Sequence, residues 1–202
     1  MKKLLYLVLL AVAAILFYSI LGSDSGDQTY ALEVAEVRKE RVNFLKSSEQ
    51  SPFKLTGQKM YPISYYPIEK SYRVNARLER IQTIERINIT NSDGTSDTYQ
   101  KYAYALFELK NLPCELLILK PVGFGIPNTF FTAFADETSG NQTYGGGRYL
   151  DLEIGKSDRI TIDFNLAYNP YCAYVGDYSC PLPPPENVLS VAVEAGEKDY
   201  PH

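Results

Sequence analysis

The residues whose types and spacing suit them to chemistry are concentrated in one stretch, Thr143–Asn187. Near its start, three consecutive glycines at 145–147 precede Arg148. Glycine lets the backbone adopt a positive φ angle or approach another group closely, and the planar guanidinium of arginine can clamp a carboxylate or a phosphate. The pattern predicts either an anion-binding turn or a surface turn whose arginine pairs with a carboxylate on a neighbouring strand.

The same stretch contains two pairs of polar residues, each pair separated by two positions, as on one face of a strand. Asp163 and Asn165 are two residues apart and should face the same side of a strand. On an interior face, such side chains must be paired or must line a wet pocket. Asp151 and Glu153 repeat this spacing on the preceding expected strand. Both a pocket-lining and a solvated position therefore remain open for each pair.

Aromatic and amide side chains continue the polar signal in the string YNPYCAY, residues 168–174. Together these features favour a domain that binds a small polar ligand, with an anionic group facing Arg148 and the glycine backbone, or a structural domain. The candidate ligand-binding residues are Arg148, Asp163, Asn165, Tyr168, Asn169, Tyr174 and Glu186.

An enzyme that relies on carboxylates is the alternative. In it, Asp163 and Glu186 would form an acid/base pair, with Arg148 or Tyr168 stabilising the developing charge. The only histidine is His202, so triads and metal sites that need histidine are excluded. No phosphate-binding glycine motif is present either. No metal or cofactor is expected, and no catalytic residue is assigned.

The three cysteines point to one covalent link. Cys172 and Cys180 are separated by seven residues in an expected loop. Outside the cytoplasm they would readily form a disulfide that stabilises the fold by roughly 2–3 kcal/mol. Cys114 would remain unpaired.

The N-terminus predicts a membrane segment. An uncharged run, Leu4–Leu21, follows Lys2 and Lys3, and at ~1.5 Å per residue it spans roughly 27 Å, enough for a bilayer core. The lysines should stay in the cytoplasm and the remainder should cross. An uncleaved anchor is favoured over a cleaved signal peptide and over a buried helix. The expected organisation is a transmembrane anchor or signal at residues 1–22, a tether at 23–29 and one extracytoplasmic globular domain at 30–202.

Composition agrees with one globular domain. The 202 residues are 45% hydrophobic and 22% charged, which is ordinary for such a domain. The formal net charge of -4 argues against nucleic acid as a partner. The membrane, through residues 4–21, and either a small polar ligand or another envelope protein are the expected partners.

The remaining elements follow from periodicity. A helix is predicted over Thr29–Lys46, with Arg41 on its apolar side either anchoring a buried carboxylate or extending to water. Later segments alternate at strand spacing. The predicted fold is mainly β (α+β), an antiparallel meander forming a half-barrel or a sandwich, with one N-terminal helix packed on it and a separate transmembrane helix. The strands are expected at Ser71–Thr90 (one or two), Tyr99–Leu109, Glu115–Val122, Phe130–Phe134 (or an irregular segment), Tyr149–Ile154, Arg159–Asn165 and Val188–Glu194.

Several strings carry a resemblance to a known family. YYPIEKSYRVNA, TYGGGRYLDLE, DFNLAYNPYCAY and CPLPPPENVL, followed by AGEK, resemble the bacterial and archaeal family catalogued as domain of unknown function 1684. The resemblance extends from about Tyr30 to Tyr200. It implies a single domain with its core in these motifs, and it implies no particular reaction.

Overall fold

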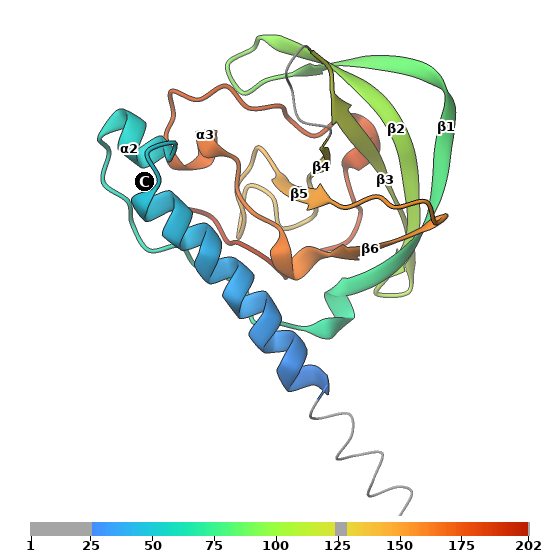
Figure 1. Cartoon of the computed structure of the whole chain (residues 1–202), viewed down its shortest axis with the longest axis horizontal. Helices are drawn as coiled ribbons and strands as arrows, with labels where there is room; N and C mark the ends of the chain where they lie inside the picture. The colour runs from blue at the N-terminus through green and yellow to red at the C-terminus, as the bar shows by residue number, and fades with distance from the viewer. Residues whose placement is uncertain (1–25, 124–128, 202) are drawn as a thin grey trace, which may run out of the picture.

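The computed structural model describes residues 26–123 and 129–201, and Figure 1 shows a curved β-sheet with a long helix lying diagonally beside it. The long helix occupies residues 26–47, so residues 26–29, expected in the tether, are helical. The predicted membrane segment at residues 4–21 lies outside the described residues. Among the helices of the described ranges, none combines the length and apolar character needed to cross a membrane.

Six antiparallel strands form one sheet in the order β5-β4-β3-β2-β1-β6. The first five strands are a meander, and β6 returns to the far side of β1, which curls the sheet into a half-barrel. This confirms the predicted mainly β half-barrel with one N-terminal helix. The strands are β1 (Arg73–Thr90), β2 (Ser96–Leu109), β3 (Leu112–Pro121), β4 (Phe130–Phe134), β5 (Arg148–Leu152) and β6 (Arg159–Asp163).

Turn chemistry and one bulge set the shape of the long hairpin. β1 is a single strand, and its register with β2 shifts between Arg80 and Glu85. Such a bulge bends and twists the paired strands. Lys110 and Asn111 both have positive φ, 52° and 62°, at the turn between β2 and β3. Two consecutive left-handed residues match the twist of a tight hairpin, so β3 begins earlier than predicted.

The segment predicted as the last strand, Val188–Glu194, is not a strand: Val188 forms an isolated bridge with Ala135, and the chain bends at residues 190–191. Its alternation is real, because every second side chain enters the core. Its backbone, however, bonds mainly to side chains. The N–H of Val193 donates to Asp136 and its carbonyl accepts from Arg148. The inward side chains of this segment and its continuation are Leu189, Val191, Val193 and Ala195.

Polar contacts dock the long helix onto the domain. Arg38 and Arg41 lie on the same face as its buried apolar residues and bond to backbone carbonyls of the β domain. Val37 is 46% exposed, because the inner positions follow steps of four and three residues that bypass it. The buried apolar positions of the helix are Tyr30, Val34 and Leu45.

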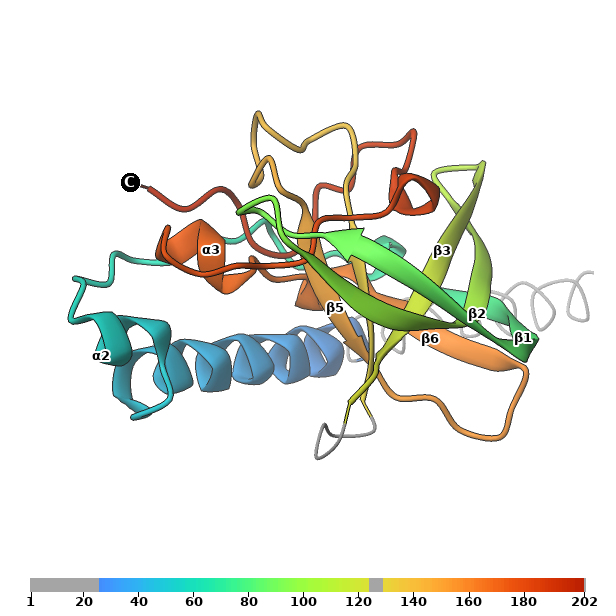
Figure 2. The same cartoon turned by 90° about the horizontal axis from the view of Figure 1, so that it is seen from above.

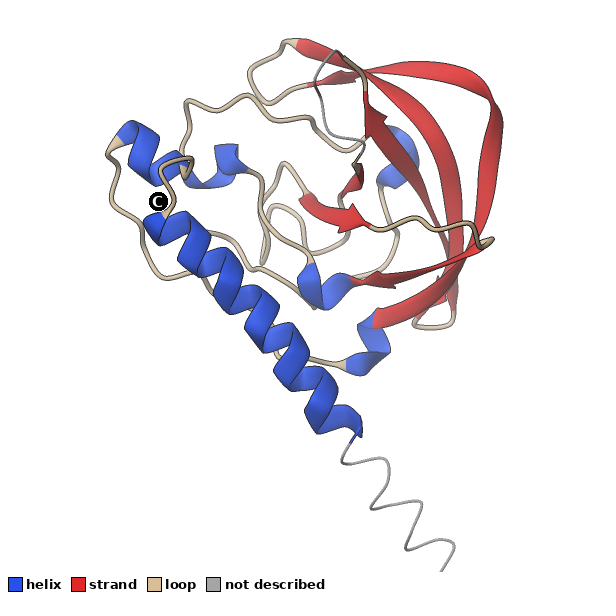
Figure 3. Ribbon diagram, in the orientation of Figure 1, coloured by secondary structure: helices blue, strands red, loops and turns tan. Residues whose placement is uncertain are grey.

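Short helices complete the fold. Figure 3 shows α2, α3 and the long helix on one side of the molecule and the strands on the other, and Figure 2 shows the long helix running away from the sheet toward α2. A second core cluster containing Leu45, Phe53 and Tyr174 joins these three helices. The short helices are α2 (Pro52–Thr56), α3 (Tyr171–Tyr174), η1 (Lys70–Tyr72), η2 (Phe164–Leu166) and η3 (Pro185–Asn187).

Candidate functional site

A groove of about 750 Å³ lies between the long helix and the edge strands β5 and β6. These strands follow one another in the chain, but β5 pairs with β4 and β6 pairs with β1. Their facing edges are therefore the two margins of the half-barrel. The helix contributes Val37, Glu40, Arg41 and Phe44 to the lining.

The groove has an apolar floor and charged walls. Asp151, on β5, and Glu153, directly after β5, form one wall of the groove. Arg159, on β6, belongs to the opposite wall. The side chains of Glu40, Glu153 and Arg159 form no hydrogen bond or ion pair with another described residue. They are free to meet a ligand. The floor is made of Leu150, Leu152, Ile160 and Leu166.

Arg41, Asp151 and Tyr168 separate this groove from a second cavity of about 340 Å³, the aromatic pocket. The Arg41 guanidinium lies 3.5 Å from the Tyr168 ring centroid, and the Tyr168 hydroxyl donates to Asp151 at 2.9 Å. Burial, and then the charge of Asp151, raises the pKa of Tyr168, which keeps this hydroxyl protonated as a donor. The other residues lining the aromatic pocket are Tyr149, Pro170, Tyr171, Tyr178, Ser179, Cys180 and Pro181.

A buried carboxylate, Glu197, holds Arg41 in place. Its Oε1 lies 3.3 Å from Nε of Arg41, within ion-pair distance but without the alignment of a hydrogen bond, and accepts the Tyr65 hydroxyl at 3.2 Å. Its Oε2 accepts the Asn169 N–H at 3.0 Å and the Tyr174 hydroxyl. Asn169 and Tyr174, two predicted ligand-binding residues, therefore support Glu197 from beneath the site.

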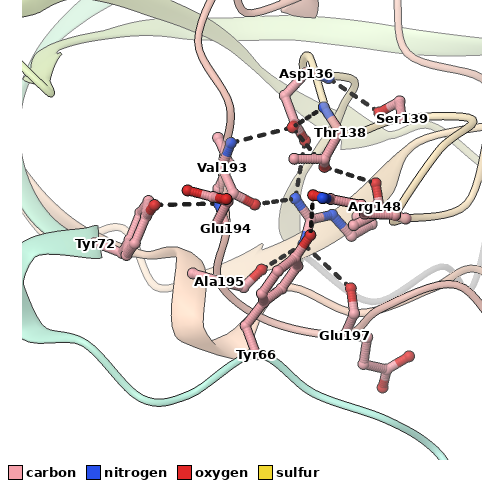
Figure 4. A network of polar contacts seen from close by, with 12 residues as sticks. Tyr66, Tyr72, Asp136, Thr138, Ser139, Arg148, Val193, Glu194, Ala195 and Glu197 are labelled. Atoms are coloured by element: carbon pink, nitrogen blue, oxygen red, sulfur yellow. Dashed lines mark hydrogen bonds and ion pairs between the residues drawn. The ribbon is translucent and has the colours of Figure 1, made fainter.

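Arg148 has no exposed surface and does not line the groove. Figure 4 shows it at the centre of a network of polar contacts. Its Nη2 donates to Asp136 Oδ2 and to the Val193 carbonyl, both at 2.8 Å. Its Nη1 donates to the carbonyls of Ala195 and, at 3.2 Å, Glu197. The protein itself thus supplies an acceptor for each of the four terminal N–H groups. Arg148 acts here as a clamp on the C-terminal segment.

The last glycine of the run allows the close packing of the chain directly before Arg148. Gly147 has a φ of 82°, and a Cβ there would lie 2.6 Å from the Phe134 carbonyl oxygen and 2.4 Å from Cγ of Pro183. Both the left-handed backbone and the close approach require glycine. At Gly145, by contrast, an added Cβ would meet nothing closer than 3.5 Å.

Asp163 and Asn165 form a cluster that fastens the long helix to the sheet. The Tyr30 hydroxyl donates to both oxygens of Asp163, at 2.9 and 2.8 Å. Asn165 Nδ2 donates to the Tyr30 oxygen and to the Glu69 carbonyl, each at 2.8 Å. Arg38 donates to the Asn165 carbonyl from the helix. Asn165 belongs to η2 and not, as predicted, to the preceding strand.

The two carboxylates of the enzyme alternative belong to different parts of the molecule. Asp163 lines one end of the groove, and its Oδ2 lies 4.0 Å from Nε of Arg73. Glu186 lies on η3 and pairs with Lys101 of β2 at 3.1 Å. It is not among the residues lining the groove. Each carboxylate has its own cation, so the geometry does not provide the shared site that an acid/base pair needs.

All three cysteines are free thiols, so the predicted disulfide between Cys172 and Cys180 is not formed, although the two residues lie next to each other. The backbone N–H of Cys172 donates to Sγ of Cys180 at 3.1 Å. Both side chains are buried, whereas Cys114 on β3 is half-buried.

Sequence reasoning missed Asp136 and Glu197 and recognised Arg41 only in part. The placement of Arg41 on an apolar helix face did predict a buried carboxylate partner as one of two outcomes. The partner stands in the AGEK string, where Gly196 has a φ of 78° and an added Cβ would meet Ala167 and Phe164. The glycine of that string indicates close backbone packing, and this was the signal in the sequence that could have pointed to Glu197.

Comparison with known proteins agrees with this architecture. A family model described as Protein of unknown function (DUF1684) matches residues 58–198. The chain is also similar to an uncharacterized protein of Haloarcula marismortui whose structure was solved by solution NMR. The identity is 34% and the TM-score 0.66, over 87% of this chain and 97% of that one. No curated protein matches. The chain therefore belongs to the DUF1684 family.

Proposed function

We propose that the domain binds a small zwitterionic ligand of amino-acid or short-peptide chemistry in the groove between the long helix and the edges of β5 and β6. One observation carries the proposal. The groove has unpaired acidic side chains, Glu40 and Glu153, and an unpaired Arg159 on different walls. Charges that protein structure leaves unpaired at the rim of a concave site are suited to a ligand with complementary charges.

The groove supports each part of such a ligand. An ammonium group would face the carboxylates on the β5 and helix side, and a carboxylate group would face Arg159. A side chain would rest on the apolar floor formed by Leu150, Leu152 and Ile160. The volume of about 750 Å³ falls within the range of small-molecule sites.

Titration of matched variants tests this function. Native mass spectrometry of the purified full chain should retain a small ligand, and calorimetric titration with a panel of amino acids and dipeptides should identify its class. Glu153→Gln and Arg159→Gln should each weaken binding about tenfold, since each removes a charge-assisted contact. Lys156→Gln, in the exposed turn between β5 and β6, should leave binding unchanged. Equal affinity in all three variants, or no binding in the panel, would refute the proposal.

We further propose that this domain is held at the outer side of a membrane by residues 4–21. The uncharged run and the two lysines before it support this placement. Membrane fractionation followed by protease treatment of spheroplasts provides the test. The intact protein should sediment with membranes and should be digested from outside. Recovery of the intact chain in the cytosolic fraction would contradict this placement.

A further inference from the structure

Cys172 and Cys180 are brought together by two separately anchored segments. Cys172 lies on α3. Cys180 lies on a segment fixed to the turn after β1, where the Ser92 N–H donates to the Cys180 carbonyl at 2.9 Å and the Cys180 N–H donates to Ser92 Oγ at 3.2 Å. The Cys172 N–H in turn donates to Cys180 Sγ at 3.1 Å. The two thiols are therefore neighbours because of the fold, and not merely because of sequence proximity.

The surroundings of the pair favour loss of one proton. Contact with the Cys180 thiol, opposed by burial, lowers the pKa of Cys172 to about 6, and the same contact raises the pKa of Cys180. The Tyr144 hydroxyl lies 3.7 Å from Cys172 Sγ as a further donor. The Cys172 N–H can stabilise negative charge on Cys180 as well.

One of the two sulfur-bearing residues can be reached from outside. Cys180 lines the aromatic pocket, whose volume is about 340 Å³. Tyr171 and Tyr178 line the same pocket, with ring centroids 5.5 Å apart. A small molecule that occupies this pocket, beside the packed tyrosine rings, therefore lies next to Cys180. Cys172 lies behind it, in the position of a resolving thiol.

We propose that Cys172 and Cys180 form a redox-active dithiol that undergoes thiol–disulfide exchange with low-molecular-weight disulfides entering the aromatic pocket. The Cys180 thiol passes its proton to the Cys172 thiolate as Cys180 Sγ attacks one sulfur of the disulfide RSSR. A mixed disulfide forms, and the released RS⁻ takes this proton from Cys172. Cys172, as a thiolate, then attacks Cys180 Sγ, which forms the Cys172–Cys180 bond and releases the second RS⁻. Two protein thiols lose two electrons and two protons, and one RSSR is reduced to two RSH.

Cys114 provides an internal control. It is half-buried on β3, it donates to the Leu112 carbonyl at 3.5 Å, and burial raises its pKa. It is not among the residues lining the aromatic pocket. A site-specific exchange should therefore spare Cys114, whereas non-specific oxidation would not.

Thiol counting on the full native chain tests the proposal. Starting from the reduced protein, oxidised glutathione should lower the free thiol count from three to one, and dithiothreitol should restore it under native conditions. Peptide mapping should place the bond between Cys172 and Cys180, and Cys114→Ser should behave in the same way. In Cys172→Ser, the glutathione adduct should accumulate on Cys180.

Three outcomes would overturn the inference, and none depends on a variant folding well. The first is a thiol count that stays at three in the native protein. The second is an adduct on Cys114 alone. The third is a bond that dithiothreitol can break only after denaturation, since that would make it a permanent cross-link. Because the dithiol does not rest on the groove's ligand, failure of the amino-acid titrations would leave these results unaffected.

Discussion

Two regions of this molecule contain arginine and carboxylate, and they use them in opposite ways. Arg148 and Asp136 are fully buried, and backbone groups of the C-terminal segment bond to both side chains, which leaves only Nε of Arg148 without a hydrogen-bond partner among the described residues. Arg159 and Glu153, at the groove, are exposed and unpaired among the described residues. A buried ion pair is acceptable only when its remaining donors and acceptors are satisfied, whereas solvated charges need no partner.

The comparison shows where to look for function in a protein of this kind. The residues that stand out in the sequence, GGGRY and NPYCAY, are mostly those that solve packing problems. Of the groove charges, Glu153 was noticed only as one of a pair with strand spacing, and Glu40 on the long helix and Arg159 on β6 belong to no motif. In this protein, the unusual GGGRY motif contains the buried Arg148. The candidate binding groove is lined by strand and helix residues that form no such motif.

The largest expected effect is at the buried pair. Arg148→Met should lower the free energy of unfolding by about 3–5 kcal/mol, because it leaves Asp136 charged, buried and without its cation. Denaturant unfolding followed by circular dichroism measures this. Arg148→Lys, which keeps the charge but not the planar fork, should fall between the variant and the wild type. If Arg148→Met lowers the free energy of unfolding by less than about 1 kcal/mol, the buried pair is not structurally different from the exposed charges of the groove.

A smaller effect is expected where the chain enters the clamp. Gly147→Ala should destabilise the fold by about 2 kcal/mol or more, because the left-handed backbone is strained with a Cβ and the Phe134 carbonyl is only 2.6 Å away from it. Gly155→Ala, in the turn at the groove, has open space around its Cβ and should change stability by less than about 0.5 kcal/mol. Thermal unfolding of the two variants, measured side by side, compares the two positions. Equal shifts in Tm would contradict the expectation that only Gly147 is constrained.

Alkaline pH should reveal which tyrosines near the site belong to the scaffold. Burial raises the pKa of Tyr149, whose hydroxyl donates to the Pro181 carbonyl at 2.6 Å. The unfolded chain releases this proton near pH ~10, so the stabilisation is complete below that pH and is lost as pH rises above it. Tyr149→Phe should reduce the alkaline slope of unfolding free energy by up to about 1.4 kcal/mol per pH unit. An unchanged slope would show that Tyr149 ionises as readily in the folded protein as in the unfolded chain.

The smallest effect on stability is expected at the groove rim. Arg159→Gln should change the free energy of unfolding by less than about 0.5 kcal/mol, because an exposed, unpaired charge contributes little to folding. Its effect should appear in ligand titration instead. If this variant unfolds as easily as Arg148→Met, then Arg159 has a structural partner and the groove loses its main cation.

Much of the fold was predictable, because strand alternation and turn residues are local signals. The alternation in Ser71–Thr90 correctly indicated the first strand, and Gly94, with a φ of 85°, lies in the turn that follows it. The segment Val188–Glu194 shows where this reasoning fails. Its side chains alternate as in a strand, but long-range side-chain donors replace the neighbouring strand, and no local pattern records that exchange.

The candidate site was less predictable than the fold. Arg148 was correctly singled out as unusual, but its carboxylate partner is twelve residues away and its carbonyl partners are more than forty residues away. The sequence shows a residue's type and not its partner, so a clamp and an anion site look alike. The groove arises because β5 and β6 separate, which depends on the topology of the whole sheet.

The docking of the long helix has a consequence for the order of folding. Tyr30 and Arg38 bond to residues 133 and 127 positions further along the chain. Contacts of such long range form late, since the intervening chain must first be closed into a loop. Until β6 and η2 are in place, Tyr30 and Arg38 lack these partners, so the helix docks fully only after the sheet has formed. For this chain, the groove between the helix and the edges of β5 and β6 is therefore completed late in folding.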